Sequence, residues 1–446
     1  MNSSDFGKDF IWGAATASYQ IEGAWNTDGK GVSIWDVFSH TKGKIKNGHT
    51  GDVSCDFYHR YPADLDLLKS LGFKHFRFSL AWTRLFPHGI GSKNQAGIDF
   101  YHRLIDACLQ RGIEPWVTLY HWDLPQALQA QGGWENRAII DWFGQYADFA
   151  TRTYGDRVKY WMIFNEPTSF VCLGYLIGIH APGKRGLGSF FRATHHANLT
   201  MAEAGRITKS NCPRAEVGTT FFTADVQAYR PVLKDQKAAA RLDVILNRLY
   251  LEPSLGLGYP IDDFEALRKI EKYFKAGDDQ KIKHTFDFIG LQNYSREVVK
   301  YALFPPVIWA KRMTPEKRAV NPENITKMGW EVYPEGIYHL LTRFARYPNV
   351  KKIYITENGA SFHDILIDNR VPDEKRIRFL EGYLEQVLRA KQEGVPVKGY
   401  FVWSLMDNFE WAEGFEQRFG LIYVDFPTQK RVVKDSGKWF KAFLER

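Results

Sequence analysis

Eight short apolar segments recur along the chain, and amphipathic helical stretches separate them. Each segment is apolar or β-branched along nearly its whole length, which is typical of parallel strands that are buried on both faces. The segments begin at Phe10, Lys74, Glu114, Lys159, Glu216, Phe286, Lys351 and Val397. Eight such strands alternating with helices favour an α/β fold, a single (β/α)8 barrel of the TIM type, over an open doubly wound sheet.

Two of the helical stretches show the spacing of a buried helix face. In the stretch 97–112, which Gly112 is placed to end, the predicted face is Ile98, Tyr101, Ile105, Cys108 and Leu109. In the stretch 373–394 it is Ile377, Leu380, Leu384, Val387 and Leu388. No linker divides the chain, so we expect residues 1–446 to form one barrel domain. No G-x-G-x-x-G follows a strand, which disfavours a dinucleotide-binding fold.

Charge and composition disfavour several classes of function. The chain has 59 basic and 51 acidic residues, a net charge of +8, but no run of five or six like charges, so we expect no nucleic-acid partner. No segment approaches the ~18 consecutive apolar residues of a membrane span. The N-terminus lacks a basic region followed by an apolar core, so we expect a cytoplasmic protein without membrane association. The oligomeric state stays open.

Cysteine usage gives no sign of a disulfide framework or of a metal site. The four cysteines are scattered, without C-x-x-C or metal-ligand spacing; they are Cys55, Cys108, Cys172 and Cys212. We therefore expect buried free thiols in a reducing compartment, and we expect neither a metal nor a cofactor. The adjacent pair His195 and His196 shows no metal pattern and is expected to pack or to face solvent.

Polar and aromatic residues gather where the predicted strands end, and in a barrel the active site lies at these C-terminal ends. The strand ends carry Gln20, Glu22, Arg77, His121, Trp122, Asp123, Asn165, Glu166, Gln292, Asn293, Tyr294, Glu357, Trp403, Asp407, Asn408, Glu410 and Trp411. Amides and carboxylates pair with hydroxyl groups, and indole rings stack on the apolar faces of sugars. The set therefore predicts a carbohydrate site, whereas Trp12, Trp35 and Trp82 are expected in the core.

Two glutamates of this set suit the hydrolysis of a glycosidic bond. A retaining glycosidase needs one carboxylate that attacks the anomeric carbon and one acid that protonates the leaving oxygen, about 5–5.5 Å apart. Glu166 and Glu357 end the fourth and the seventh predicted strands, which face each other across the barrel mouth. A single glutamate at a strand end is more often solvated or ion-paired, so the prediction of a glycosidase depends on the presence of both glutamates.

Four motifs resemble glycoside hydrolase family 1, the β-glucosidase family. In chain order they are FIWGAATASYQIEGAW from Phe10, NEP at 165–167, ITENG at 355–359 and WSLMDNFEW from Trp403. The resemblance runs from about Phe6 to the C-terminus. It implies a retaining β-glycosidase, most often a β-glucosidase, with Glu166 as acid/base and Glu357 as the nucleophile that forms a covalent glycosyl-enzyme. The expected substrate is a small β-glucoside or a short oligosaccharide cut from its non-reducing end.

The resemblance also implies roles for other residues. Arg77 and Tyr294 would hold Glu357 charged, and Asn165 would donate to the sugar 2-hydroxyl. The remaining sugar-binding residues would be Gln20, His121, Trp122, Trp330, Trp403, Glu410, Trp411 and Phe419, with Trp330 as platform for the leaving group. Family members that act on 6-phosphosugars bind phosphate with Ser, Lys and Tyr in the segment that contains Glu410. The charge of Glu410 therefore predicts a non-phosphorylated substrate.

Two segments depart from the family pattern. Gln292 and Asn293 stand before Tyr294 where Asn-Tyr is common, and Thr168 follows NEP where many members have Trp. Glu166 itself is intact, whereas the thioglucosidase branch has Gln there, so we expect O-glycosides as substrates. The effect of the departures on the sugar and the leaving group stays open.

Two functions of other classes are alternatives. A binding or receptor module on the same fold would lack one of the two glutamates, whereas this chain has both. A metal-dependent or phosphate-binding barrel enzyme would need a His/Asp cluster or a Gly-rich loop after the last two strands, and the sequence shows neither. Among glycosidases, β-galactosidase, β-fucosidase and transglycosylase activities stay open.

Overall fold

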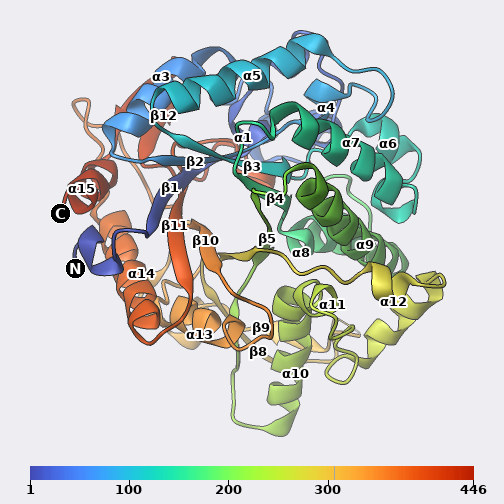
Figure 1. Cartoon of the computed structure of the whole chain (residues 1–446). Helices are drawn as coiled ribbons and strands as arrows, with labels where there is room; N and C mark the ends of the chain where they lie inside the picture. Colours follow the sequence, from blue (N-terminus) through green and yellow to red (C-terminus); the bar gives the residue numbers. More distant parts are fainter. Residues whose placement is uncertain (306) are drawn as a thin grey trace.

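Eight parallel strands close into a barrel in the computed structural model, which describes residues 1–305 and 307–446 (Figure 1). The strands are β1 (Ile11–Ala15), β2 (His75–Ser79), β3 (Glu114–Tyr120), β4 (Tyr160–Asn165), β5 (Glu216–Phe222), β7 (Phe288–Gln292), β10 (Ile353–Asn358) and β11 (Val397–Trp403). They follow one another around the barrel in chain order, and β11 pairs back to β1. Every predicted apolar segment contains one of these strands, so the predicted (β/α)8 barrel is confirmed.

Helices connect the strands and cover the outside of the barrel (Figure 1). The longer ones are α3 (Phe57–Ser70), α5 (Gln95–Gln110), α7 (Ile139–Tyr154), α9 (Leu187–Asn211), α10 (Leu233–Asp243), α13 (Glu335–Phe344), α14 (Glu374–Gln392) and α15 (Asp435–Leu444). Shorter helices are α1 (Ser18–Ile21), α2 (Ile34–His40), α4 (Trp82–Leu85), α6 (Gln126–Ala130), α8 (Pro167–Val171), α11 (Leu251–Ser254) and α12 (Asp278–Lys281). In the described part of the chain, no helix is long and apolar enough to cross a membrane.

The two predicted helix faces correspond to α5 and α14, with one error. Leu109 was predicted to be buried, but it is 36% exposed. It belongs to the last turn of α5, where the side chain has passed the edge of the packed face, and Leu104 lies in the core in its place. In α14, Ile377 and Leu388 are only half-buried.

Two small sheets lie outside the barrel. Strands β6 (Asp225–Ala228), β8 (Arg296–Tyr301) and β9 (Ala310–Arg312) form one of them, and α10 packs against it. Strands β12 (Ile422–Asp425) and β13 (Lys430–Val433) form an antiparallel hairpin that precedes α15. Neither sheet interrupts the eight-stranded barrel.

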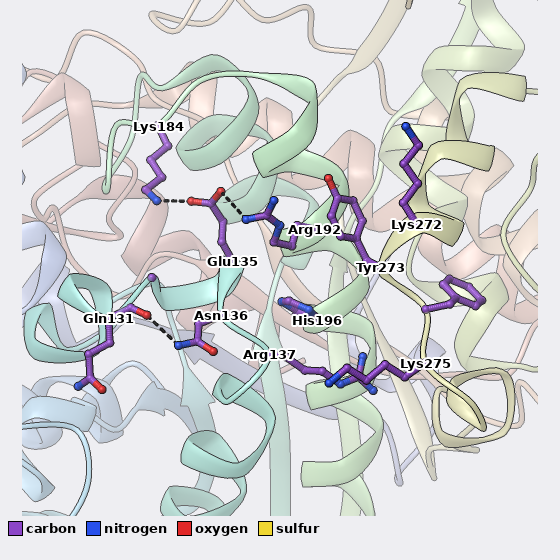
Figure 2. Close-up of a pocket in the computed structure, with 12 residues that line it drawn as sticks. Gln131, Glu135, Asn136, Arg137, Lys184, Arg192, His196, Lys272, Tyr273 and Lys275 are labelled. Atoms are coloured by element: carbon purple, nitrogen blue, oxygen red, sulfur yellow. Dashed lines mark hydrogen bonds and ion pairs between the residues drawn. The ribbon is translucent and has the colours of Figure 1, made fainter.

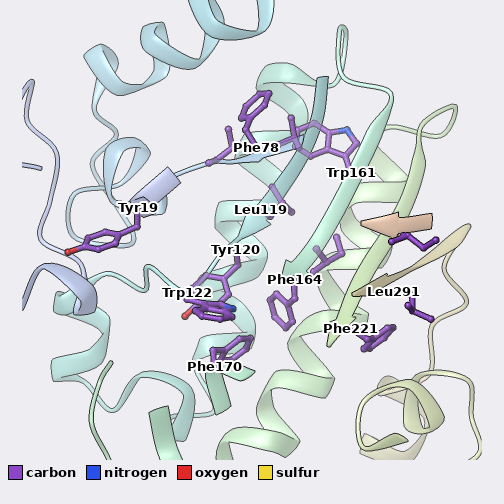
Figure 3. Close-up of a cluster of buried hydrophobic side chains, with 14 of the residues drawn as sticks. Tyr19, Phe78, Leu119, Tyr120, Trp122, Trp161, Phe164, Phe170, Phe221 and Leu291 are labelled. Atoms are coloured by element: carbon purple, nitrogen blue, oxygen red, sulfur yellow. The ribbon is translucent and has the colours of Figure 1, made fainter. Parts of the chain in front are cut away.

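The core has an outer and an inner part. The outer part lies between the strands and the helices, and Figure 3 shows a section of it around Trp161, Phe164 and Phe221. Within the barrel, Trp116 of β3 packs against Phe401 of β11 with ring centroids 4.8 Å apart, although these strands are not neighbours. The interior is therefore filled with side chains, and a ligand can enter only at an end of the strands.

Several residues that were not assigned to the site lie where the sequence predicted. Trp35 and Trp82 are buried, Trp12 is half-buried against the core, and the four cysteines are buried. The two chain ends meet: the Ser3 hydroxyl donates to the Leu444 carbonyl at 3.3 Å, and Figure 1 shows both termini side by side. Phe440 of α15 packs against Phe73, which precedes β2, so the ends meet at the N-terminal side of the barrel.

Candidate active site

A cavity of about 280 Å³ lies at the C-terminal ends of the strands. The predicted site residues that line it are His121, Trp122, Asn165, Glu166, Tyr294, Trp330, Glu357, Trp403, Glu410, Trp411 and Phe419. They come from the ends of β3, β4, β7, β10 and β11 and from the loops that follow, as the barrel predicts. Among the residues to which the resemblance assigns a catalytic or sugar-binding role, Arg77 and Gln20 do not line the cavity, and both are buried.

Two hydrogen-bond donors hold the carboxylate of Glu357. Arg77 Nη1 donates to Oε1 at 2.5 Å, and the Tyr294 hydroxyl donates to Oε2 at 2.6 Å. Burial raises the pKa of Glu357, and Arg77 and Tyr294 oppose that rise by stabilising the charged form. The negative charge of Glu357 is therefore stabilised by a hydrogen bond to each of its two carboxylate oxygens.

The residue after Glu357 and Asn358 must be glycine for a steric reason. A Cβ atom on Gly359 would lie 1.7 Å from the carbonyl oxygen of Trp403. Asn358 accepts from the Tyr400 hydroxyl at 2.6 Å and donates to the Asn293 carbonyl. The ENG motif thus joins the ends of β7, β10 and β11 and sets Trp403 beside Glu357.

Glu166 occupies a backbone conformation that side-chain-bearing residues rarely adopt. It has φ 45° and ψ 71°, in the left-handed region, between the end of β4 and α8, and Pro167 is the first residue of α8. Two other residues lining the cavity, Trp122 and Trp411, also have positive φ, of 81° and 47°. Strained backbone of this kind concentrates at functional sites, where the surrounding packing holds it.

Glu166 and Glu357 have unequal surroundings. Burial, and then the charge of Glu357, raise the pKa of Glu166 to about 8. Ser169 and Arg77 oppose this rise only in part, and no cation pairs directly with Glu166 among the described residues. Glu166 therefore favours its protonated form, while Arg77 and Tyr294 favour the charged form of Glu357, which is the division of roles that acid-assisted nucleophilic attack requires.

A third carboxyl group, Glu410, changes the physical reason for expecting a non-phosphorylated substrate. Burial, and then the charge of Glu357, raise the pKa of Glu410 to about 8, so near neutral pH this side chain is mainly an uncharged acid. Repulsion between a Glu410 charge and a phosphate therefore does not operate in the empty cavity. Instead, no lysine or arginine lines the cavity in the described chain, so a phosphate would find no cation there.

Gln20 supports Glu410 from behind. Its Nε2 donates to the Phe409 carbonyl at 2.9 Å and approaches Glu410 Oε2 at 3.4 Å. Because the same nitrogen also donates to Asn408, the amide is held in one orientation. Gln20 therefore fixes the segment that carries Glu410 in the empty cavity.

The positions that depart from the family pattern have separate surroundings. Gln292 Nε2 donates to Asn165 Oδ1 at 2.8 Å, next to the cavity. Asn293 instead donates to the backbone carbonyls of Thr223 and Ser295, both at 3.0 Å, and so stabilises the loop after β7. Thr168 is buried and does not line the cavity, whereas the following residue, Ser169, does.

Sequence reasoning missed part of the lining and selected some residues that do not belong to it. The missed residues are Ser169, Leu173, Ile179, His180, Phe222, Met328, Ala412 and Glu413. Phe222 ends β5 and Ser169 lies three residues after Glu166, so their positions signalled these two, whereas the other six lie outside the motifs and away from the predicted strand ends. At the strand ends, Glu22 pairs with Arg84 at 2.6 Å and Asp407 with Arg418 at 2.7 Å, so both belong to structural ion pairs.

A second cavity, of about 630 Å³, lies between the loop after β3 and helix α9 (Figure 2). Glu135 is its only acidic lining residue in the described chain, and it pairs with Lys184 and lies 3.9 Å from Arg192. His196 lies in the wall and donates from Nδ1 to the Trp134 carbonyl at 2.9 Å, a packing role. His195 is likewise buried, against Asp278 at 2.9 Å. This cavity therefore lacks the two carboxyl groups that hydrolysis needs.

Comparisons with known proteins agree with this geometry. The family model described as "Glycosyl hydrolase family 1" matches residues 2–446. The chain is 45% identical to Beta-glucosidase A of Thermotoga maritima, over 100% of this chain and 99% of that protein. It is 43% identical to Beta-glucosidase A of Acetivibrio thermocellus, over 100% and 99%.

A solved structure gives the same result for the fold. The structure of the beta-glucosidase from Thermotoga maritima in complex with glucoimidazole superimposes with a TM-score of 0.93 at 44% identity, over 99% of this chain and 98% of that one. The matches span the barrel and the motifs that carry Glu166 and Glu357. The chain therefore belongs to glycosyl hydrolase family 1 and is a glycoside hydrolase, as the resemblance of its motifs predicted.

Proposed function

We propose that this chain is a retaining β-glucosidase, with residues 1–446 acting as one catalytic unit. Its substrates are non-phosphorylated β-D-glucosides, such as cello-oligosaccharides and aryl or alkyl β-glucosides, which it cuts at the non-reducing end. The observation that carries the proposal is the pair of buried glutamates in one aromatic-lined cavity, of which only Glu357 is held by an arginine and a tyrosine. The family and the names of its relatives support the same activity.

In the first step, the Glu357 carboxylate attacks the anomeric carbon while Glu166 transfers its proton to the glycosidic oxygen. The bond to the leaving group breaks, and the sugar becomes an ester of Glu357. This esterification removes the negative charge of Glu357, which is one of the causes of the raised pKa of Glu166. The pKa of Glu166 therefore falls at the stage when this residue must act as a base.

In the second step, the Glu166 carboxylate takes a proton from a water molecule, and the resulting hydroxide attacks the anomeric carbon. The ester bond breaks and returns the electron pair to Glu357. Arg77 and Tyr294, which hold the two oxygens of this carboxylate, stabilise the returning charge. Two inversions at the same carbon give a product with the configuration of the substrate.

Sugar recognition follows from what surrounds the two glutamates. Asn165 shares the Arg77 guanidinium with Glu357, so its amide lies beside the carbon under attack and suits the neighbouring 2-hydroxyl. Burial, and then the charge of Arg77, lower the pKa of His121, which binds as a neutral ring. Glu410, supported by Gln20, hydrogen-bonds hydroxyl groups. Trp122, Trp403 and Trp411 pack on the sugar, and Trp330 and Phe419 pack on the leaving group.

Retention of configuration tests the proposed mechanism directly. Proton NMR of the sugar released from an aryl β-glucoside, recorded before mutarotation, is expected to show the β anomer first, because two displacements occur at the anomeric carbon. Freshly dissolved β-D-glucose without enzyme controls for spontaneous mutarotation. If the α anomer appears first, the double displacement is wrong.

A panel of aryl glycosides tests the substrate. We expect kcat/KM for 4-nitrophenyl β-glucoside to exceed that for its 6-phosphate by at least about 100-fold, since no lysine or arginine among the described residues lines the cavity. In the same panel, the galacto substrate tests a changed C4 configuration, the fuco substrate a changed C4 configuration together with the loss of the 6-hydroxyl, and the manno substrate a changed C2 configuration. Equal or faster hydrolysis of the 6-phosphate would refute the proposed substrate class.

A further inference from the structure

The amide group of Asn165 has an orientation that its neighbours determine. Its Oδ1 accepts from Arg77 Nη2 at 2.6 Å, from Gln292 Nε2 at 2.8 Å and from the Thr220 hydroxyl at 3.1 Å. An arginine side chain can only donate, so the atom that faces Arg77 must be the oxygen. The amide nitrogen then points the other way, toward His121 Nε2 at 3.0 Å and the cavity.

The orientation of Gln292 follows from that of Asn165. Because Asn165 presents its oxygen, Gln292 must present its nitrogen, and this nitrogen also donates to the Thr220 hydroxyl at 3.2 Å. Gln292 Oε1 is left buried, with no hydrogen-bond partner among the described residues. A reversed amide would set two acceptor oxygens against each other, so the bond to Asn165 decides the orientation although an acceptor stays unpaired.

Gln292 acts from behind the cavity. It is fully buried and does not line the cavity itself. It extends from β7, whereas Asn165 ends β4, and β5 with Thr220 lies between these two strands. The side chain therefore has to reach across the end of an intervening strand, and the longer glutamine suits that reach better than the asparagine common at this position.

We infer that Gln292 is a positioning residue that keeps the amide nitrogen of Asn165 directed at the sugar 2-hydroxyl; this inference rests on the proposed function. Gln292 lies in register with Glu357 on the neighbouring strand. Arg77 contacts both Glu357 and Asn165, so the bond from Gln292 to Asn165 belongs to the same cluster as the group that attacks the anomeric carbon. Hydrogen bonds to the 2-hydroxyl strengthen in the transition state of glycoside hydrolysis, so their alignment affects the rate.

The experiment compares two substrates that differ only in the hydroxyl concerned. Gln292→Met keeps the size of the side chain and removes its donor. We expect kcat/KM for 4-nitrophenyl β-glucoside to fall about 10- to 100-fold. With 4-nitrophenyl 2-deoxy-β-glucoside, corrected for spontaneous hydrolysis, we expect a fall of less than about 3-fold, because the misaligned contact is already missing.

Matched variants separate positioning from a general loss of structure. Gln429→Met removes a buried amide that donates to the carbonyls of Ser54 and Phe426 outside the cavity, and it is expected to change neither substrate. Gln292→Asn keeps the donor on a shorter side chain, and we expect a smaller loss in the same direction. If Gln292→Met does not fold, the ratio of the two substrates measured with Gln292→Asn carries the test.

The outcomes distinguish this inference from the proposed function. Equal losses on both substrates would overturn the positioning role, because a merely structural defect does not depend on the 2-hydroxyl. A wild-type protein that hydrolyses neither substrate would instead refute the proposed function. An undiminished rate for Gln292→Met on the glucoside, with the fold intact, would also overturn the inference.

Discussion

We expect Glu357→Gly to lower the hydrolysis of 4-nitrophenyl β-glucoside by at least about 10⁴-fold, because the attacking carboxylate is removed. Glycine also leaves a space beside Arg77 and Tyr294, which normally bind the two carboxylate oxygens. A small anion such as azide can enter this space and attack the anomeric carbon once. Added azide is therefore expected to restore release of nitrophenol and to yield an α-glucosyl azide, identified by NMR.

The control for this variant is Glu216→Gly. Glu216 begins β5 and pairs with Lys352 at 2.6 Å, so it lies on a barrel strand but at the end opposite to the cavity. We expect this variant to keep its activity and to show no response to azide. Near wild-type hydrolysis by Glu357→Gly, with the protein free of wild-type contamination, would show that Glu357 is not the nucleophile.

The second large effect concerns Glu166 and depends on the leaving group. Glu166→Ala removes the proton donor, so we expect kcat/KM to fall about 10²- to 10⁴-fold for cellobiose, whose glycosidic oxygen would otherwise leave as an unstable alkoxide. For 2,4-dinitrophenyl β-glucoside, whose leaving group departs unprotonated, the first step should lose far less. Burst kinetics would then show accumulation of the glycosyl-enzyme, because the second step lacks its base.

The same residue predicts the alkaline limb of the pH profile. Glu166 must be protonated to act, and its pKa is raised to about 8, so kcat/KM of the wild type is expected to decline as the pH rises through about 8. The pH profile of Glu166→Ala with the dinitrophenyl substrate should lack this decline. If the decline persists, Glu410, whose pKa is also raised to about 8, is the group that titrates.

The fold could be predicted from the sequence because the signal is repeated eight times. Each parallel strand buries both faces, so its apolar run stands out without knowledge of its neighbours. The surface of a helix is less certain, since small shifts at its end decide exposure, as for Leu109. The additional strands β6, β8 and β9 were not predicted, because most of their residues are partly or fully exposed and so form no continuous apolar run.

The part of the site that consists of motif residues at strand ends could be predicted from the sequence. Tyr294 contacts Glu357 as the resemblance implied, although the two residues before it differ from the common pattern. Position at a strand end alone selected residues that do not belong to the site. Spacing along the chain does not reveal that Glu22 forms an ion pair with Arg84, or Asp407 with Arg418. The protonation of Glu410 could not be predicted from the sequence either, since it depends on burial and on the nearby charge of Glu357.

The meeting of the chain ends has a practical consequence. Ser3 and Ser4 bond to the backbone of Leu444 and Arg446, on the side of the barrel away from the cavity. A carrier protein, an affinity tag or a solid support attached at either terminus would therefore leave the substrate entrance unobstructed. A short peptide that joined the two ends would permit new termini to be opened elsewhere, for instance in a surface loop, without separating the strands that hold the two glutamates.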